Sequence, residues 1–235
     1  MLYVAATPIG NLEDITLRVI RLFKEADVIL CEDTRVTGIL LKHLEIPHKE
    51  FIVINAFNEA KNIDWIIGRI AQANIAVLVS DAGTPGISDP GVRLVNAAKS
   101  AGIEIAALPG ASSVTAALSI AGIPTDSYLF EGFLPLKKGR QKKLKELSQF
   151  EATIVLFESS HRIEKLLSEL RQYIPDRLVL VMREITKKFE ETWEGYPQQL
   201  VESFPEKISK GEFVVLIAKK GFKRSEGIAF TPGEQ

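Results

Sequence analysis

Residues 80–91 hold the densest group of turn-forming and polar residues in the chain. The segment contains three glycines and two prolines, and it directly follows the apolar run at 76–79. Glycine lets backbone N–H and C=O groups approach a ligand closely, and side chains such as Ser80, Asp81 and Thr84 can supply polar contacts. A long connecting turn is the plainer interpretation. We favour a binding loop, because open α/β sheets bind ligands at the carboxyl ends of their strands.

A second candidate segment, residues 7–14, follows the apolar run at 2–6. Its Gly10 turn can present backbone donors to a ligand. The segment lacks the G-x-G-x-x-G pattern of dinucleotide sites and the G-x-x-x-x-G-K-[ST] pattern of P-loops, so nucleotide phosphates are not the indicated ligand. A plain connection to the next helix, with Asp14 as its cap, explains this segment equally well.

Three ionisable side chains, Glu32, Asp33 and Arg35, follow the apolar run at 28–31. They should lie at the rim of the sheet, where an arginine suits recognition of an anionic or planar polar substrate. The alternative is a structural role, in which Asp33 or Thr34 caps the following helix and a local ion pair forms.

Ser112 and Ser113 stand between an apolar run and a helix of small residues. The N–H groups at such a helix start can bind a carboxylate or another anion. Either serine can equally serve as the N-cap, and the two roles are compatible.

Glu158, His161 and Arg162 lie between a strand at 153–157 and an amphipathic helix, so they should cluster at a strand end. A lone histidine near a helix start is more often a surface or cap residue than a catalyst.

The elements that must position these residues alternate regularly along the first half of the chain. Strands are predicted at 2–6, 28–31, 51–54, 76–79 and 103–108, with helices near 16–25, 34–44, 59–73, 90–101 and 113–121. This alternation predicts an α/β domain over residues 1–123, a mainly parallel sheet with helices on both faces.

The pattern changes after the turn-forming residues 122–127, where we place a domain boundary. Strands are predicted at 128–133, 153–157, 178–183, 189–193 and 213–218, with helices at 138–150, 161–173 and 196–203. Fewer helices per strand predict a mixed-sheet α/β domain over 124–220. Residues 221–235 lack periodicity and are expected to form a mobile tail.

The composition of the 235 residues, 46% hydrophobic and 25% charged, is that of a globular chain without a membrane span or signal pattern, so a cytoplasmic location is expected. A single cysteine, Cys31, excludes an internal disulfide and a two-cysteine metal site. The net charge of −1 gives no sign of nucleic-acid binding, so such a surface must be local. The one candidate is 137–145, with six basic residues in nine positions, although a solvated helix face is the commoner explanation.

Taken together, these motifs resemble one family, the small-subunit ribosomal RNA methyltransferases of the tetrapyrrole methylase superfamily. The resemblance runs in order from Leu2 to about Lys219, and its segments are 7–14, 32–35, 80–91, 108–113, 132–135, 157–162 and 183–191. It implies a two-domain enzyme, typically a homodimer. Such an enzyme uses S-adenosylmethionine to methylate the ribose 2′-O of a decoding-site cytidine in 16S rRNA.

The resemblance also implies residue roles. S-adenosylmethionine carries no phosphate, in agreement with the missing phosphate motifs, and in the superfamily it lies between the domains. The implied cofactor contacts are Pro8, Ser80, Asp81, Ala82, Gly83, Thr84, Ile87, Ser112 and Ser113, with Phe133, Leu134 and Glu158 from the second domain. The candidate RNA contacts are Asn11, Arg35, Lys138, Arg140, Arg162, Arg183 and Lys187. No metal and no membrane partner is expected.

For the reaction, a ribose hydroxyl is a weak nucleophile, and a general base or a cation that stabilises the developing alkoxide would help. Candidate bases are Asp33, Asp81, Glu158 and His161, and candidate cations are Arg35, Arg183 and Lys187; the sequence does not choose among them. Three other functions stay open. They are methylation of a tetrapyrrole, sensing of S-adenosylmethionine without chemistry, and RNA binding through the basic helix alone.

Overall fold

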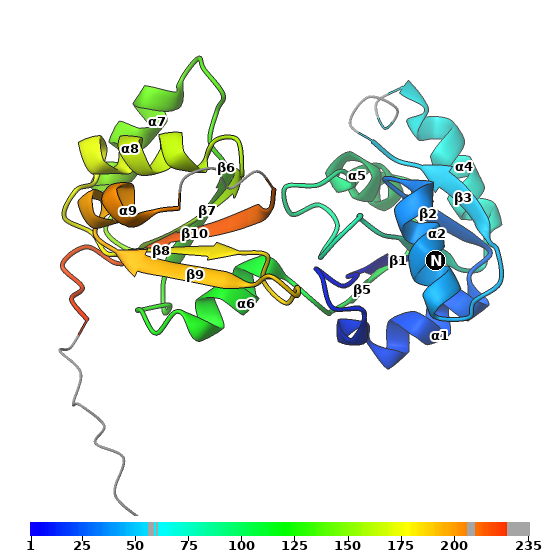
Figure 1. The fold of residues 1–235 in the computed structure, drawn as a ribbon. Coiled ribbons are helices and arrows are strands. Elements are labelled where there is room, and N and C mark those ends of the chain that lie inside the picture. Colours follow the sequence, from blue (N-terminus) through cyan, green and yellow to red (C-terminus); the bar gives the residue numbers. More distant parts are fainter. Residues whose placement is uncertain (56–58, 60, 206–209, 225–235) are drawn as a thin grey trace, which may run out of the picture. The chain divides into compact units, whose positions relative to one another are not determined.

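The computed structural model describes residues 1–55, 59, 61–205 and 210–224, and these form two compact units (Figure 1). The N-terminal unit comprises Met1–Ala116 together with Glu184–Glu190. The C-terminal unit comprises Ala117–Arg183 and the described residues from Glu191 onward.

A five-stranded parallel sheet forms the centre of the N-terminal unit. Its strand order is β3-β2-β4-β1-β5, and every neighbouring pair is parallel, as the sequence predicts. The strands are β1 (Leu2–Ala5), β2 (Val28–Cys31), β3 (Glu50–Val53), β4 (Ala76–Leu78) and β5 (Ile105–Leu108).

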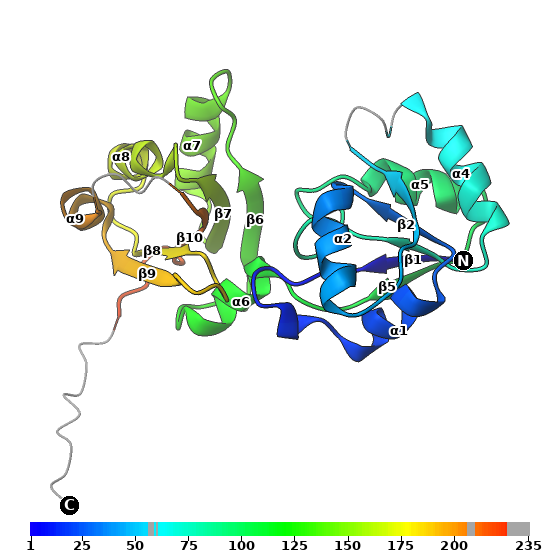
Figure 2. The same cartoon turned by 45° about the vertical axis from the view of Figure 1, so that its right-hand side comes forward.

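Helices cover both faces of this sheet (Figure 2). The connections from β1 to β2 and from β2 to β3 run toward one edge, and those from β3 to β4 and from β4 to β5 run back across the sheet. Right-handed crossovers in opposite directions place their helices on opposite faces. Accordingly, α1 (Leu17–Glu25) and α2 (Thr34–His43) pack on one face, and α4 (Ile63–Gln72) and α5 (Val92–Ser100) pack on the other.

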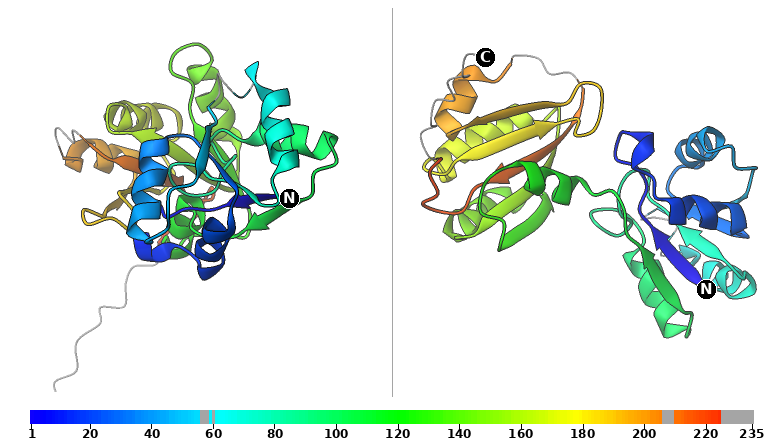
Figure 3. Two further views of the ribbon diagram at one scale, coloured as in Figure 1. Left: turned by 90° about the vertical axis from the view of Figure 1, so that its right-hand side faces the viewer. Right: turned by 90° about the horizontal axis from the view of Figure 1, so that it is seen from below.

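The C-terminal unit contains a mixed sheet, also as predicted. Its strand order is β6-β7-β10-β8-β9; only β6 and β7 are parallel to each other, and the other neighbouring pairs are antiparallel. The strands are β6 (Tyr128–Phe133), β7 (Thr153–Ser159), β8 (Val179–Arg183), β9 (Glu191–Gly195) and β10 (Glu212–Ile217). One face is buried by α7 (Arg140–Gln149), α8 (Ile163–Tyr173) and α9 (Pro197–Ser203) (Figure 3).

The strand predicted at 189–193 is shifted, because β9 begins at Glu191. A turn occupies Glu184–Glu190: Glu184 and Thr186 have positive φ, and the Thr186 N–H donates to the Glu190 carboxylate at 2.7 Å. This capped turn delays the start of the strand.

The structure can be compared with the predicted limits of the second domain at residues 124 and 220. The compact units divide within α6 (Ser113–Ile120), before the expected limit at 123, so the domain boundaries stay a prediction. Within the expected tail, Arg224 pairs with Glu194 at 2.6 Å and donates to the Gly122 carbonyl at 2.6 Å, whereas 225–235 lie outside the described residues. No helix in the described part of the chain could cross a membrane.

Candidate functional site

The predicted site segments of the N-terminal unit meet at the carboxyl edge of its sheet, beside β1 and β4. These two adjacent strands send their connections in opposite directions, which is the arrangement at which open α/β sheets bind ligands. There the Thr7 N–H donates to the Gly83 carbonyl at 2.9 Å, and the Gly83 N–H donates to the Thr7 carbonyl at 3.0 Å. Thr7 Oγ1 also donates to the Ser80 carbonyl at 3.1 Å. The turn after β1 therefore fixes the loop after β4.

The same loop is held from its other side by the segment after β5. Thr84 Oγ1 donates to the Ala111 carbonyl at 3.3 Å. Gly110 passes so close to β1 that a Cβ there would lie 3.0 Å from the Cβ of Ala6. The connections after β1, β4 and β5 thus form one continuous rim, which includes the half-buried Ser112 and Ser113.

The segment after β2 completes this rim with charged groups. Asp33 is the N-cap of α2 and accepts from the Arg35 N–H at 2.8 Å, as one of the two interpretations of the sequence predicted. Its carboxylate also binds the Arg35 guanidinium, with a shortest distance of 2.6 Å. The Asp33 N–H donates to Asp81 Oδ1 at 3.0 Å, so the β2 and β4 segments are joined through Asp81.

The carboxyl groups of this rim differ in their ionisation. Hydrogen bonds from Arg35 hold the pKa of Asp33 at about 2. Partial burial, with the neighbouring Asp33 charge as a further cause, raises the pKa of Asp81. Burial and the charges of Asp81, Asp89 and Asp33 raise the pKa of Glu32. Asp33 therefore stays ionised and paired with Arg35. Asp81 takes up a proton more readily than an ordinary aspartate, so it is the better proton acceptor of the two.

A small pocket opens beside Asp81. Its volume is about 150 Å³, and its walls are mostly apolar. The lining residues are Thr7, Pro8, Leu12, Val36, Thr37, Ile39, Leu40, Ser80 and Asp81. Complete small-molecule sites usually measure about 300–1,000 Å³. This pocket can therefore hold one ring or chain of a ligand but not a whole nucleoside cofactor.

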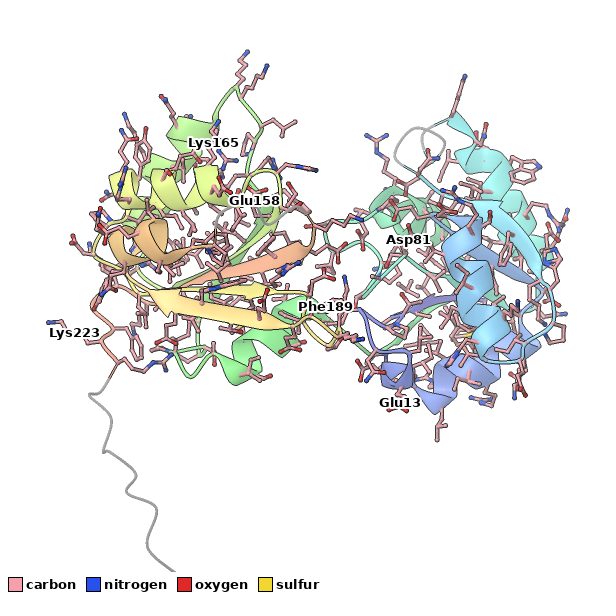
Figure 4. All side chains as sticks on the ribbon, viewed as in Figure 1. Glu13, Asp81, Glu158, Lys165, Phe189 and Lys223 are labelled. Atoms are coloured by element: carbon pink, nitrogen blue, oxygen red, sulfur yellow. The ribbon has the colours of Figure 1, made fainter. Side chains whose placement is uncertain are left out.

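Except for Lys187, which belongs to the N-terminal unit, the candidates from the second predicted domain lie in the C-terminal unit, and Figure 4 shows Glu158 there and Asp81 in the N-terminal unit. The Glu158 side chain is fully buried and its Oε1 lies 2.6 Å from Arg162 Nη2. Arg140, only 3% exposed, pairs with Glu169 at 2.7 Å and lies 3.6 Å from Glu158 Oε2. An arginine buried between two carboxylates cannot present its charge to RNA, so we leave Arg140 out of the proposed RNA contacts.

The remaining candidates have varied surroundings. Phe133 is exposed and Leu134 is buried, and His161 is exposed in the turn before α8. Arg183 pairs with Glu191 at 2.6 Å, and Lys187 pairs with Glu184 at 3.1 Å. Among the others, Ile87 and Lys138 are exposed, Pro8 and Gly83 are buried, and Asn11 caps the 3-10 helix η1 (Leu12–Asp14). Their roles stay predictions.

Two features of the site escaped the sequence analysis. Thr7 lies in a recognised motif, but the two backbone hydrogen bonds between Thr7 and Gly83 join residues far apart in sequence, which no local signal reveals. The apolar pocket wall from Val36 and Ile39 had a detectable signal, because these residues lie outside the buried stripe of α2 and are exposed.

Residues 1–200 match the family described as Tetrapyrrole (Corrin/Porphyrin) Methylases. The chain belongs to the tetrapyrrole methylase family. Two relatives are named Ribosomal RNA small subunit methyltransferase I. One, from Borrelia garinii subsp. bavariensis, is 45% identical over 93% of this chain and 99% of its own. The other, from Synechocystis sp., is 42% identical over 93% of this chain and 78% of its own.

A solved structure supports the fold. Uroporphyrin-III C-methyl transferase from Thermus thermophilus, complexed with S-adenosyl homocysteine, superposes with a TM-score of 0.63. The identity is 19%, with 91% of this chain and 96% of the other covered. The present chain, as a member of the tetrapyrrole methylase family, is a methyltransferase whose methyl donor is S-adenosylmethionine, as predicted from the sequence.

The residues of the rim fit that donor. The ammonium and sulfonium groups of S-adenosylmethionine are cationic, and the edge carries the carboxyl groups of Glu32 and Asp81, whereas the Asp33 carboxylate is already paired with Arg35. S-adenosylmethionine carries no phosphate, and the loops contain no phosphate-binding motif.

Proposed function

We propose that this chain methylates the ribose 2′-O of a cytidine in the decoding site of small-subunit ribosomal RNA. The names of relatives 40 to 45% identical over more than nine-tenths of the chain support the choice of RNA. The observation that carries the chemistry is Asp81, a carboxyl group of raised pKa at the point where the β1, β2 and β4 segments are tied together.

The rim would hold the cofactor, which supplies the electrophilic methyl group when bound. The proposed contacts are Pro8, Ser80, Asp81, Ala82, Gly83, Thr84, Ile87, Ser112 and Ser113. Thr7 and Thr84 fix this loop on both sides, so its backbone groups are positioned before a ligand arrives. From the C-terminal unit, Leu134 is kept as a proposed contact, whereas the exposed ring of Phe133 is assigned to the RNA below.

In the transfer step, the ribose oxygen forms a bond to the methyl carbon as the carbon–sulfur bond breaks, and the hydroxyl proton must leave. Asp81 would accept this proton, because its raised pKa makes it a stronger base than Asp33. Asp33 would instead hold Arg35, whose side chain is 87% exposed, as the cation that faces the anionic substrate. His161 remains a second candidate for the base.

The proposed RNA contacts are Asn11, Arg35, Lys138, Arg162, Arg183 and Lys187. Lys138 lies in the local basic segment predicted from the sequence and is exposed. We further propose that the chain works as a homodimer in the cytoplasm, where ribosomal subunits are assembled.

The test is a transfer reaction with 30S subunits and S-adenosylmethionine that carries a labelled methyl group, followed by alkaline hydrolysis of the 16S rRNA. A 2′-O-methyl group blocks alkaline cleavage at its own nucleotide, so the proposal predicts label in a dinucleotide that resists alkali. Label on a base, released as an ordinary mononucleotide, would contradict it. Asp81→Asn should abolish transfer, and because Asp81 is also a proposed cofactor contact, transfer is measured at a saturating concentration of S-adenosylmethionine.

A further inference from the structure

An aromatic side chain stands exposed at the end of an edge strand in the C-terminal unit. Phe133, the last residue of β6, is 52% exposed. Its ring packs edge-on against Phe157, with a centroid distance of 5.6 Å, and Phe157 packs in the same way on Phe130 at 5.0 Å. The Phe133 ring therefore packs against Phe157 on one side, and about half of its surface is open to solvent.

A β-bulge creates this arrangement. The pairing of β6 with β7 shifts between Phe130 and Gly132, so that Phe130 lies opposite Val155 and Phe133 lies opposite Phe157. Without the extra residue, Phe133 would point to the other face. Gly132 has a φ of +70°, which glycine adopts without strain.

An ion-pair network built on the buried Glu158 holds Arg162 against this ring. The Arg162 guanidinium lies over the Phe133 ring, 5.7 Å from its centroid, and donates to the Leu134 carbonyl at 3.4 Å. Glu158 holds Arg162 at 2.6 Å and is itself oriented by the Ser159 N–H at 2.9 Å.

Arg140 extends the network to the next residue of the loop. It donates to the Pro135 carbonyl at 3.2 Å, and Glu169 holds its guanidinium at 2.7 Å. Two consecutive carbonyls after Phe133 thus accept from arginines that are themselves held by glutamates, which fixes the backbone beside the exposed ring. A ring held in advance loses little conformational entropy when a ligand stacks on it.

The residues that follow carry unpaired positive charge. Leu136 is 69% exposed, and Lys137 and Lys138 are exposed with no ion pair to any part of the chain that the structure describes. By contrast, Lys143 of α7 is held by Glu131 at 3.0 Å. The β6–α7 connection therefore joins a flat aromatic surface to free cations.

We propose that Phe133 is a stacking platform for a base of the single-stranded RNA substrate, with Lys137 and Lys138 on the adjoining phosphates. Proteins that bind single-stranded RNA combine these two elements, an aromatic face for the base and cations for the backbone. Glu158 is then a positioning residue that acts through Arg162, because its buried carboxylate cannot reach a ligand. This inference rests on the proposed function, since it requires an RNA substrate.

The experiment measures KM for 30S subunits, kcat and the Kd of S-adenosyl homocysteine for the wild-type chain and for Phe133→Leu. Loss of one stacked base should raise KM for RNA about tenfold and leave the Kd of S-adenosyl homocysteine unchanged. Phe133→Tyr should restore KM. Tyr128→Leu, at the other end of β6 and 42% exposed, is the matched control and should leave all three values unchanged.

The role of Glu158 is tested by a double-mutant cycle. Glu158→Gln should raise KM for RNA, and combining it with Phe133→Leu should add little, because both changes disable the same platform. Independent effects that multiply would show that Glu158 acts elsewhere. If Glu158→Gln does not fold, Phe133→Leu and Phe133→Tyr still decide the proposal.

The possible failures are separable. An unchanged KM for RNA in Phe133→Leu, with normal methylation by the wild-type chain, overturns the platform alone. A weaker affinity for S-adenosyl homocysteine with an unchanged KM for RNA would assign the ring to the adenine of the cofactor and also overturns it. Absence of RNA methylation by the wild-type chain contradicts the proposed function itself.

Discussion

Gly83 offers a sharp test of how the site is held, because its substitution should act through the backbone alone. Its φ is +79°, in the left-handed region. A Cβ there would meet Ile9 Cγ2 at 3.4 Å, an ordinary contact, so Gly83→Ala causes no clash. The left-handed conformation destabilises an L-residue by about 1–2 kcal/mol. Alanine also lowers the conformational entropy of the unfolded chain, which stabilises the folded state by about 0.4–1 kcal/mol. The expected net loss is about 1 kcal/mol.

Gly68 provides the matched control, because the same substitution there should have the opposite sign. It is exposed in the interior of α4, and a Cβ would meet nothing within 4 Å. Gly68→Ala should stabilise the chain by about 1 kcal/mol, the difference in helix propensity. For a chain of this length, each change shifts Tm by about 2–4 °C, downward for Gly83→Ala and upward for Gly68→Ala.

Binding separates the two variants further. The Gly83 backbone forms both hydrogen bonds to Thr7, so strain at Gly83 disturbs the rim directly. Titration calorimetry with S-adenosyl homocysteine should show weaker binding for Gly83→Ala and unchanged binding for Gly68→Ala. If Gly83→Ala keeps both its Tm and its affinity, the reasoning that this bridge fixes the cofactor loop is wrong.

Three further changes test other parts of the structure. Arg177→Met removes a buried guanidinium that donates to the carbonyls of Phe150, Ala152 and Ala218 at 2.6 Å each. The unfolding free energy in urea should fall by about 3–5 kcal/mol, and a loss below about 1 kcal/mol would refute the assigned role. Asp33→Ala should lower kcat on 30S subunits without changing the affinity for S-adenosyl homocysteine, and full transfer by this variant would remove Asp33 from the substrate site. The pKa of Asp81 is higher in the folded chain than in the unfolded chain. Ionisation of Asp81 therefore destabilises the fold as the pH rises from the unfolded-state pKa through the folded-state pKa. Asp81→Asn should therefore raise Tm at pH 7 while kcat falls, and a lower Tm would show that the Asp81 charge stabilises the fold.

Much of the fold could be predicted from the sequence because its signals are local. The apolar runs of β1, β2 and β4 alternate with helical periodicity, and this alternation alone indicates a parallel sheet. The order of the strands could not be predicted, because it depends on packing between distant segments.

The same limit explains the outcome at individual residues. Asp33 was correctly given as a possible cap because a cap depends on the next few residues. Arg140 belongs to a basic run that suggests an exposed face, yet Glu158 and Glu169 draw it into the interior. Both partners lie on elements distant in sequence, so no local pattern indicates this burial.

The central claim is that the substrate is RNA, and one competition measures it directly. The pure chain is given S-adenosylmethionine with a labelled methyl group in the presence of both 30S subunits and uroporphyrinogen III, and the two products are separated and counted. We expect label in the 16S rRNA of the 30S subunits and none in the tetrapyrrole. Label in the tetrapyrrole alone would contradict it.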